Sequence, residues 1–165
     1  MVIIPDMQKR ISIHVFLLAI LLEALLLGLL PPRSTKAAAG TAADLIAAVN
    51  AYRASNGLEP YQVDSSLMSI AQSHSEYQAS IETCTHERAD GSRPGDYGVS
   101  SENIACGISL SVETAIYVQW ADELHLMTML GPETGLVGAG VAISENNIVY
   151  YTLDVKRLTG DFTYR

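Results

Sequence analysis

The pattern of apolar and polar positions divides the chain near residue 40. Residues 11–30 are almost continuously apolar, and Glu23 is the one charge among them. Lys9 and Arg10 stand before this run, and a small-residue stretch, 37–40, follows it. A positive start, an apolar middle and a small-residue site are typical of a secretory signal peptide. Residues 1–39 are therefore predicted to be an export leader.

The same segment also fits an uncleaved membrane anchor. A helix of about 20 residues, rising ~1.5 Å per residue, can just cross a hydrocarbon core ~30 Å thick. Glu23 would cost about 3 kcal/mol near the centre of that core. Both alternatives export the rest of the chain, which we expect to work outside the cytoplasm. It is either secreted or anchored facing outward, with membrane contact only if the leader is retained.

Two helices with apolar faces are predicted between the leader and the first long loop. Thr41 or Asp44 can cap the first helix, whose apolar residues recur at three- and four-residue steps until Asn56 ends it. Asp64 can cap the second helix, which runs to Ile81.

A long polar loop and a short strand are predicted next. The stretch from Thr83 to Ser101 is rich in turn formers, including Asp90-Gly91 and Pro94-Gly95. A loop of this length inside a small domain is often functional. Glu102 to Cys106 is predicted to be a strand.

The last third of the chain predicts a helix followed by a hairpin. Ser109 or Ser111 can cap the helix, which is expected to end near Glu123 to His125. Two apolar runs separated by a polar four-residue turn predict the hairpin strands, at 137–143 and 148–155.

Three further features of this part concern packing. Gly138 and Gly140 would let another backbone or a helix approach the first hairpin strand closely. His74 and Trp120 lie on apolar helix faces and are expected in the core, the histidine with a hydrogen-bond partner. Residues 158–165 are expected to form a loose tail.

The charge balance changes once the leader is set aside. The chain has 10 Lys and Arg and 18 Asp and Glu, and residues 1–39 hold four of the former and two of the latter. The remainder therefore carries 6 basic and 16 acidic side chains, a net charge of −10. Such a surface repels phosphate backbones, so nucleic acid is not expected as a partner.

The two cysteines, Cys84 and Cys106, both lie in the exported part. An even pair in an oxidising compartment favours a disulfide, worth ~3 kcal/mol for a loop of this length in the chain-entropy model. Two buried free thiols are the alternative.

Five pieces of the chain, in this order and spacing, resemble the CAP superfamily. That superfamily groups cysteine-rich secretory proteins, insect antigen-5 proteins and plant pathogenesis-related proteins with many short bacterial members. The pieces are Asn50-Ala51-Tyr52-Arg53, His86 with Asp90-Gly91-Ser92, Glu102-Asn103-Ile104-Ala105, the helix ending in Trp120, and Val137-Gly138-Ala139-Gly140-Val141-Ala142. They cover about residues 44–155, and the resemblance identifies residues 41–157 as an SCP-like extracellular domain. Ser101 departs from the family, which usually has glycine there.

The resemblance implies an α+β fold and a set of cleft residues. The family fold is a three-layer α-β-α sandwich, with a small antiparallel sheet between helices. Its cleft commonly holds two histidines and two acidic residues. By position these are His86, Glu102, Glu123 and His125 in this chain. Glu123 and His125 are two residues apart, so both can face one cleft only if the helix ends between them.

The chemistry of these four side chains leaves two alternatives open. His86 and His125 could hold zinc or another divalent cation, with a carboxylate completing or orienting the shell. Without a metal, the carboxylates could share protons with the histidines. The sequence has no Gly-x-Ser-x-Gly elbow, no His-Glu-x-x-His helix and no phosphate-binding glycine loop.

Three functions from different classes follow. The first is an extracellular binding module whose cleft takes a divalent metal and a small, lipid-like or protein ligand. The second is a metal-dependent hydrolase acting on peptide or cell-wall material through the same cleft. The third is a structural or interaction domain with no ligand in the cleft.

Overall fold

The first helix of the computed structural model is α2, Ala42–Ser55, and it begins and ends as the sequence predicts. Thr41 and Asp44 form a reciprocal cap: the Asp44 N–H donates to Thr41 Oγ1 at 3.1 Å, and the Thr41 N–H donates to Asp44 Oδ2 at 2.8 Å. These bonds satisfy amide groups that a helix start leaves unpaired. Asn56 follows as the C-cap.

The second helix, α3, spans Ser65–Ile81, which also confirms the prediction. Asp64 caps it by accepting a hydrogen bond from the Leu67 N–H at 2.9 Å. The helix ends at Glu82, whose φ of 50° is left-handed. This residue turns the chain into the long loop that carries His86.

The structure describes residues 39–159, so the predictions for the leader and for residues 160–165 lie outside it. Among the residues described, no helix is both long and apolar enough to span a membrane.

Four strands form one sheet in the order β1-β3-β4-β2. They are β1 (Gln62–Val63), β2 (Ser101–Ile108), β3 (Thr134–Ile143) and β4 (Ile148–Thr159). The β1–β3 pair is parallel, and the other two pairs are antiparallel. The predicted strand and hairpin are confirmed and are longer than predicted. Leu158 and Thr159 belong to β4, so the expectation that they open a loose tail was wrong.

The third predicted helix is not continuous, which corrects the prediction. Ser111 caps a short helix, α4 (Val112–Thr114), and a π-helical turn, η2 (Ala115–Gln119), follows it directly. The chain then breaks, and a new helix, α5, spans Glu123–Leu130. The break arises because Asp122 acts as a second N-cap, accepting from the N–H groups of Leu124 and His125 at 3.0 and 3.2 Å.

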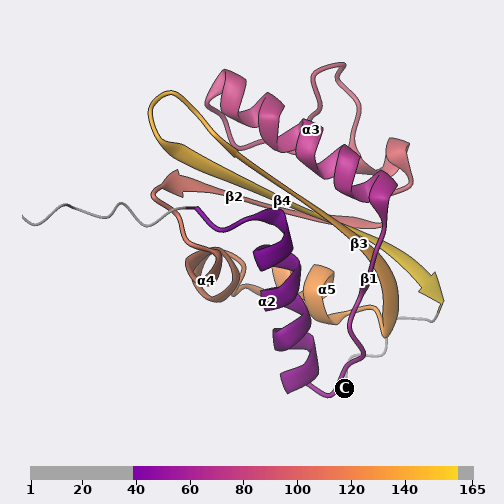
Figure 1. The fold of residues 1–165 in the computed structure, drawn as a ribbon. Helices are drawn as coiled ribbons and strands as arrows, with labels where there is room; N and C mark the ends of the chain where they lie inside the picture. The colour runs from indigo at the N-terminus through magenta and orange to yellow at the C-terminus, as the bar shows by residue number, and fades with distance from the viewer. Residues whose placement is uncertain (1–38, 160–165) are drawn as a thin grey trace, which may run out of the picture. The chain divides into compact units, whose positions relative to one another are not determined.

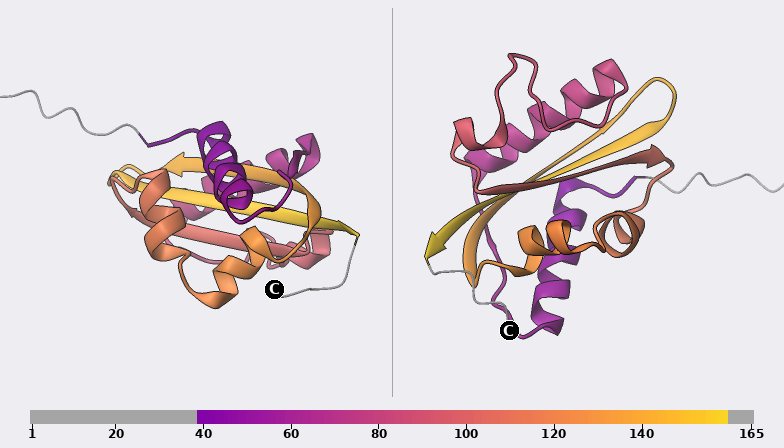
Figure 2. Two further views of the ribbon diagram at one scale, coloured as in Figure 1. Left: turned by 90° about the horizontal axis from the view of Figure 1, so that it is seen from below. Right: turned by 180° about the vertical axis from the view of Figure 1, so that it is seen from behind.

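The helices cover the sheet on both faces, as Figures 1 and 2 show. Helix α3 lies on one face, together with the loop that leads through the short 3-10 helix η1 (Pro94–Tyr97) into β2. Helices α2, α4 and α5 lie on the other face. The predicted three-layer α-β-α sandwich is therefore confirmed.

Alternation along the strands gives the two faces different contents. Odd-numbered residues in the central parts of β3 and β4 point into the apolar core with α2, α4, η2 and α5. The buried members of that core on the strands are Ala105, Val137, Ala139, Val149, Tyr151, Leu153 and Val155. Trp120 lies in the same core and is fully buried, as predicted.

The even-numbered face packs against α3 at backbone distance. A Cβ atom at Gly138 would collide with the backbone of Leu67, and one at Gly140 would collide with the carbonyl oxygen of Ala71. The prediction that these glycines admit a close helix is confirmed. This contact sets α3 tightly against the middle of the sheet.

Candidate functional site

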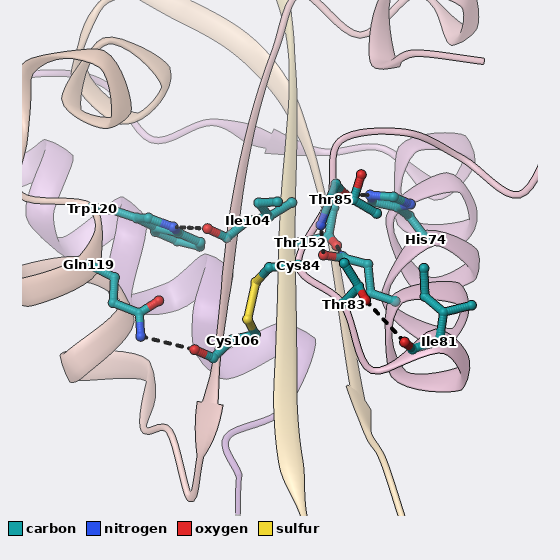
Figure 3. The surroundings of a disulfide bond; sticks show 11 residues. His74, Ile81, Thr83, Cys84, Thr85, Ile104, Cys106, Gln119, Trp120 and Thr152 are labelled. Carbon is teal, nitrogen blue, oxygen red and sulfur yellow. Dashed lines mark hydrogen bonds between the residues drawn. A yellow bond between two sulfur atoms is a disulfide. The ribbon is translucent and has the colours of Figure 1, made fainter. Parts of the chain in front are cut away.

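A disulfide joins Cys84, in the loop after α3, to Cys106 on β2, with 6.1 Å between the Cα atoms (Figure 3). The predicted pairing is confirmed. The bond anchors the start of the long loop to the sheet two residues before His86. On the other side of β2, Trp120 Nε1 donates to the Ile104 carbonyl at 2.8 Å (Figure 3). Strand β2 is therefore held from both sides.

Glu102 lies near the start of β2 and is the centre of a buried polar cluster. Its side chain is 1% exposed. His86 Nδ1 lies 2.7 Å from Glu102 Oε1, and Arg88 Nη1 lies 2.6 Å from Glu102 Oε2. The structure thus brings together two of the four predicted residues, His86 and Glu102, and adds Arg88 to them.

Asp154 is the second carboxyl group of this cluster. It is the partner of Glu102 across β2 and β4, and its Oδ2 lies 3.5 Å from Arg88 Nη2. Burial and then the neighbouring Glu102 carboxylate raise the pKa of Asp154 to about 9. Asp154 therefore holds a proton at neutral pH.

That proton explains how two acids share one buried site. Burial by itself would raise the pKa of Glu102, but the hydrogen bonds from His86 and Asp154 and the charge of Arg88 outweigh it and lower that pKa. Glu102 Oε2 and Asp154 Oδ1 accept no well-aligned hydrogen bond from other donors among the described residues. One proton carried by Asp154 and donated to Glu102 leaves a single negative charge beside Arg88.

His74 borders the same cluster from α3. Its Nε2 lies 2.6 Å from the Thr85 carbonyl oxygen and 3.9 Å from Glu102 Oε1. Because a carbonyl only accepts, Nε2 carries the hydrogen and donates it. Burial lowers the pKa of His74, which keeps the ring neutral. The prediction of a core histidine with a hydrogen-bond partner is confirmed.

Arg88 and Asp154 are the members of the cluster that sequence reasoning missed. Asp154 offered a signal, since it is the only charged residue in the apolar run Ile148–Val155. Its position opposite Glu102 depends on strand register, which the sequence did not provide. Arg88 follows His86 by two residues in a polar loop. Most of its neighbours in the sequence are also polar, so no local pattern indicates that its side chain is buried.

His125 and Glu123 lie in the first turn of α5, on the other side of the sheet from α3. His125 Nδ1 lies 2.5 Å from Asp122 Oδ2, and the His125 carbonyl accepts from Asn103 Nδ2 at 2.9 Å. The carboxylate beside this histidine is that of Asp122, whereas Glu123 is exposed. The role of His125 and Glu123 in one cleft shared with Glu102 stays a prediction.

The two predicted histidines share one geometric feature that bears on metal binding. In each ring, Nδ1 is hydrogen-bonded to a carboxylate: Glu102 is the partner of His86, and Asp122 is the partner of His125. The other ring nitrogen, Nε2, is left for a metal ion. A carboxylate behind a histidine fixes its tautomer and raises its basicity as a metal ligand. The donor chemistry of each ring, taken by itself, suits a divalent cation. Among residues 39–159, however, no group of three or more His, Cys, Asp or Glu side chains is placed to hold one.

Known proteins with the same architecture match this chain in sequence or in structure. The model of the cysteine-rich secretory protein family matches residues 46–155. The structure is similar to that of an outer surface protein from Borrelia burgdorferi, with a TM-score of 0.58 and 16% identity over 70% of this chain and 91% of that one. Comparison with curated protein sequences gives no match.

A second solved structure is an extracellular protein containing an SCP domain from Bacillus anthracis, with a TM-score of 0.55 and 22% identity. The match covers 70% of this chain and 39% of that protein, so this chain spans less than half of its length. These likenesses support the fold, and the family match covers well over half of the sequence. The chain belongs to the cysteine-rich secretory protein family, CAP.

Proposed function

We propose that this chain is an extracellular binding module and not an enzyme, and that the surface around His86 contacts its ligand. The observation that carries the proposal is the state of Glu102. One of its oxygens accepts from His86 at 2.7 Å, and the other is ion-paired with the Arg88 guanidinium at 2.6 Å. Hydrolysis would need this carboxylate as an acid or a base, but here Glu102 binds His86 and Arg88 and stabilises the site.

A general base must have a free lone pair and a pKa near the working pH. Glu102 has a lowered pKa and is 1% exposed, so it neither accepts a proton readily nor meets water. His86 is different, because its side chain is 43% exposed while Nδ1 is held by the carboxylate. This arrangement presents a fixed imidazole to solvent, which suits recognition of a ligand.

An extracellular location is supported by independent features. The family is one of secretory proteins, and the similar structures are described as an outer surface protein and an extracellular protein. The Cys84–Cys106 disulfide suits an oxidising compartment. The sequence pattern of residues 1–39 is that of an export leader.

A divalent metal at His86 and His125 is a second candidate, favoured by the carboxylate behind each ring. These two residues would hold the ion through Nε2, while Glu102 and Asp122 orient them. Bound there, zinc would supply a Lewis-acidic anchor for an anionic or carbonyl-bearing ligand. Two protein ligands leave the remaining positions to that ligand or to water.

The experiment is a calorimetric titration of the chain from Thr41 onward with zinc, beside the H86A/H125A double variant. Glu145→Ala, in the hairpin turn, is the control. Binding that the double variant loses and E145A keeps would support the metal site. No heat with any of the three would leave a metal-free binding module.

The non-enzymatic part of the proposal is tested with zinc-loaded protein on peptide and cell-wall substrates. We expect no turnover above that of the double variant. Turnover that a chelator and His125→Ala both abolish would overturn the proposal in favour of a metal-dependent hydrolase.

A further inference from the structure

A short segment, Ala39 and Gly40, leads directly into helix α2 at the start of the described part of the chain (Figure 1). Both residues are half-buried, and Ala39 packs against the apolar core cluster. In the sequence, this segment is the end of the predicted export leader. Ala37 and Ala39 stand at the third and first positions before the Ala39–Gly40 bond, which is the small-residue spacing of a leader cleavage site.

Gly40 is held by contacts from two distant parts of the chain. Its N–H donates to the Tyr151 hydroxyl at 3.0 Å. That hydroxyl is itself fixed, because Tyr151 is fully buried and donates to the Leu110 carbonyl at 3.2 Å. A Cβ atom at residue 40 would collide with Cγ2 of the buried Val112. The backbone on the C-terminal side of the Ala39–Gly40 bond therefore lies within the fold.

The residues that follow Gly40 are already part of the helix start. Thr41 is the N-cap of α2 and exchanges hydrogen bonds with Asp44, including one from Thr41 Oγ1 to Asp44 Oδ2 at 2.7 Å. The Thr41 carbonyl accepts from the Leu45 N–H at 3.0 Å, which closes the first helical turn. No extended residue separates the Ala39–Gly40 bond from this cap.

A peptidase acts on backbone that is free to take an extended form in its active site. Cleavage therefore concentrates at exposed termini and loop tips, and it depends on the burial and hydrogen bonding of the backbone concerned. To reach the Ala39–Gly40 bond in the folded domain, a peptidase would need Gly40 to leave Tyr151 and the cap of α2 to open. Such local opening occupies only a fraction of the folded molecules, so it slows cleavage.

We propose that the Ala39–Gly40 bond is the processing site of this chain and that folding of the domain closes it. A signal peptidase hydrolyses the bond: the C–N bond breaks, and the oxygen of water joins the Ala39 carbonyl carbon, which becomes a carboxylate. Both hydrogens of the water go to the Gly40 nitrogen, which becomes an α-ammonium group. The leader is therefore removed from a chain that has not yet folded, and a chain that folds first keeps it.

The cleaved chain can adopt the same fold. The Gly40 ammonium group still has a hydrogen to donate to the Tyr151 hydroxyl, and the core loses only the half-buried methyl group of Ala39. Folding and processing therefore compete for one bond. Their relative rates decide whether the domain is secreted or stays joined to the apolar run at 11–30 and faces outward from the membrane. This inference goes beyond the proposed function, because it concerns release of the domain and not its ligand.

The test incubates the full chain, folded in detergent, with a purified signal peptidase, and mass spectrometry follows cleavage and identifies the new N-terminus. In a comparison variant, eight Gly and Ser residues are inserted between Gly40 and Thr41, a spacer of up to about 27 Å. The insertion separates the bond from α2 and leaves residues 37–40 unchanged. We expect the variant to be cut after Ala39 at least about tenfold faster, since cleavage of the unmodified chain has to wait for local opening.

Two controls separate shielding from other effects. The same eight residues inserted after Glu145, in the hairpin turn, lengthen the chain equally but leave the bond against α2, so cleavage should stay slow. Tyr151→Phe removes the acceptor of Gly40 and should speed cleavage by about two- to tenfold. Tyr150→Phe, on the α3 side of the sheet, should not change the rate. Urea denaturation verifies that each variant is folded.

Each outcome supports or overturns the proposal. Equal cleavage rates for the unmodified chain and the insertion before Thr41 would overturn the shielding. Cleavage at another bond, or no cleavage of that insertion variant, would overturn the assignment of the site. Zinc and ligand binding at His86 is measured on the chain from Thr41 onward, which lacks the processing site. Failure of the proposed function is therefore distinguishable from failure of this inference.

Discussion

The two faces of the sheet are built from the same strands, but one face buries apolar side chains and the other buries polar groups. Along β4, Tyr151 and Leu153 enter the apolar core with α2, α4 and α5. The alternate residues Thr152 and Asp154 point toward α3 and its loop, where Thr152 accepts from Ser75 and Gln78, at 2.9 and 3.0 Å. The first face is stabilised by removing apolar area from water. The second depends on each polar group finding its own partner.

Each face also buries one arginine, and the contrast is informative. Arg53 of α2 is fully buried and donates to main-chain carbonyls, including those of Met129 at 2.7 Å and Pro132 at 2.9 Å. Its guanidinium carbon lies 3.5 Å from the centre of the Tyr61 ring. No carboxylate takes part in these contacts.

Arg88, on the α3 side, is held instead by Glu102 and Asp154, which share a proton. Arg53 therefore ties together α2, the end of α5 and the start of β3 through groups that do not titrate. Arg88 belongs to a cluster whose charge depends on pH. The comparison indicates that the α2–α4–α5 face buries its arginine among neutral groups, whereas the α3 face buries its arginine in a cluster that can titrate.

The largest expected effect tests the apolar face. Trp120→Ala should lower the free energy of unfolding by about 3–5 kcal/mol, because it removes a fully buried indole from the core. The loss should be nearly the same at pH 5 and pH 8, because the core cluster around Trp120 contains no Asp, Glu or His side chain. Urea denaturation at both pH values measures it. Val118→Ala, at a position 69% exposed, is the control and should change little; a similar loss in both variants would remove Trp120 from the core.

The disulfide tests how the polar face is held together. The C84A/C106A double variant should lose about 3 kcal/mol of stability, because the unfolded chain regains the freedom of a loop closed across 22 residues. Thermal unfolding of the two proteins compares them. Thiol titration of the untreated protein should find no reactive cysteine, and two titrating thiols would contradict the bond.

The close contact of α3 with the sheet gives an intermediate effect. Gly140→Ala places a methyl group against the carbonyl oxygen of Ala71, and backbone cannot yield as a side chain can. We expect a cost of about 1–3 kcal/mol, measured by chemical denaturation. Gly95→Ala is the matched control, because a Cβ there meets nothing within 4 Å. Equal stability of the two variants would show that α3 does not pack this closely.

The effect that is smallest when expressed per pH unit comes from the titration of Asp154, and it separates the two faces of the sheet most clearly. Asp154 has a pKa of about 9 in the folded protein against an ordinary value of 3.8, so the folded state holds a proton that the unfolded state releases. Its contribution to stability is complete below pH ~4 and declines as pH rises toward 9, by at most about 1.4 kcal/mol per pH unit for one proton.

Asp154→Asn mimics the protonated acid and should remove that decline. The variant should gain stability relative to the wild type as pH rises from 5 to 9, as measured by urea denaturation across this range. Asp90→Asn, at an exposed loop position, should leave the pH dependence nearly unchanged. Parallel curves for Asp154→Asn and the wild type would mean that Asp154 is already ionised in the folded state.

Local sequence signals determined the secondary structure well. Capping residues such as Thr41 and Asp64, and the polar turn of the hairpin, act within a few residues of themselves, so their effect can be read along the chain. The resemblance to the CAP superfamily added the layers of the sandwich and the expectation that His86 and Glu102 share one site. The break after Trp120 was missed, because Asp122 was not recognised as a second helix cap.

Tertiary structure alone decided the composition of the site. Register across β2 and β4 places Asp154 opposite Glu102, and the folded loop carries Arg88 into the space between them. The tertiary structure also makes Asp122, and not Glu123, the hydrogen-bond partner of His125. These pairings join residues up to 66 positions apart. They depend on burial and charge at close range, which no local pattern of residue types records, whereas helix caps and strand alternation are properties of neighbouring residues and could be read from the sequence by itself.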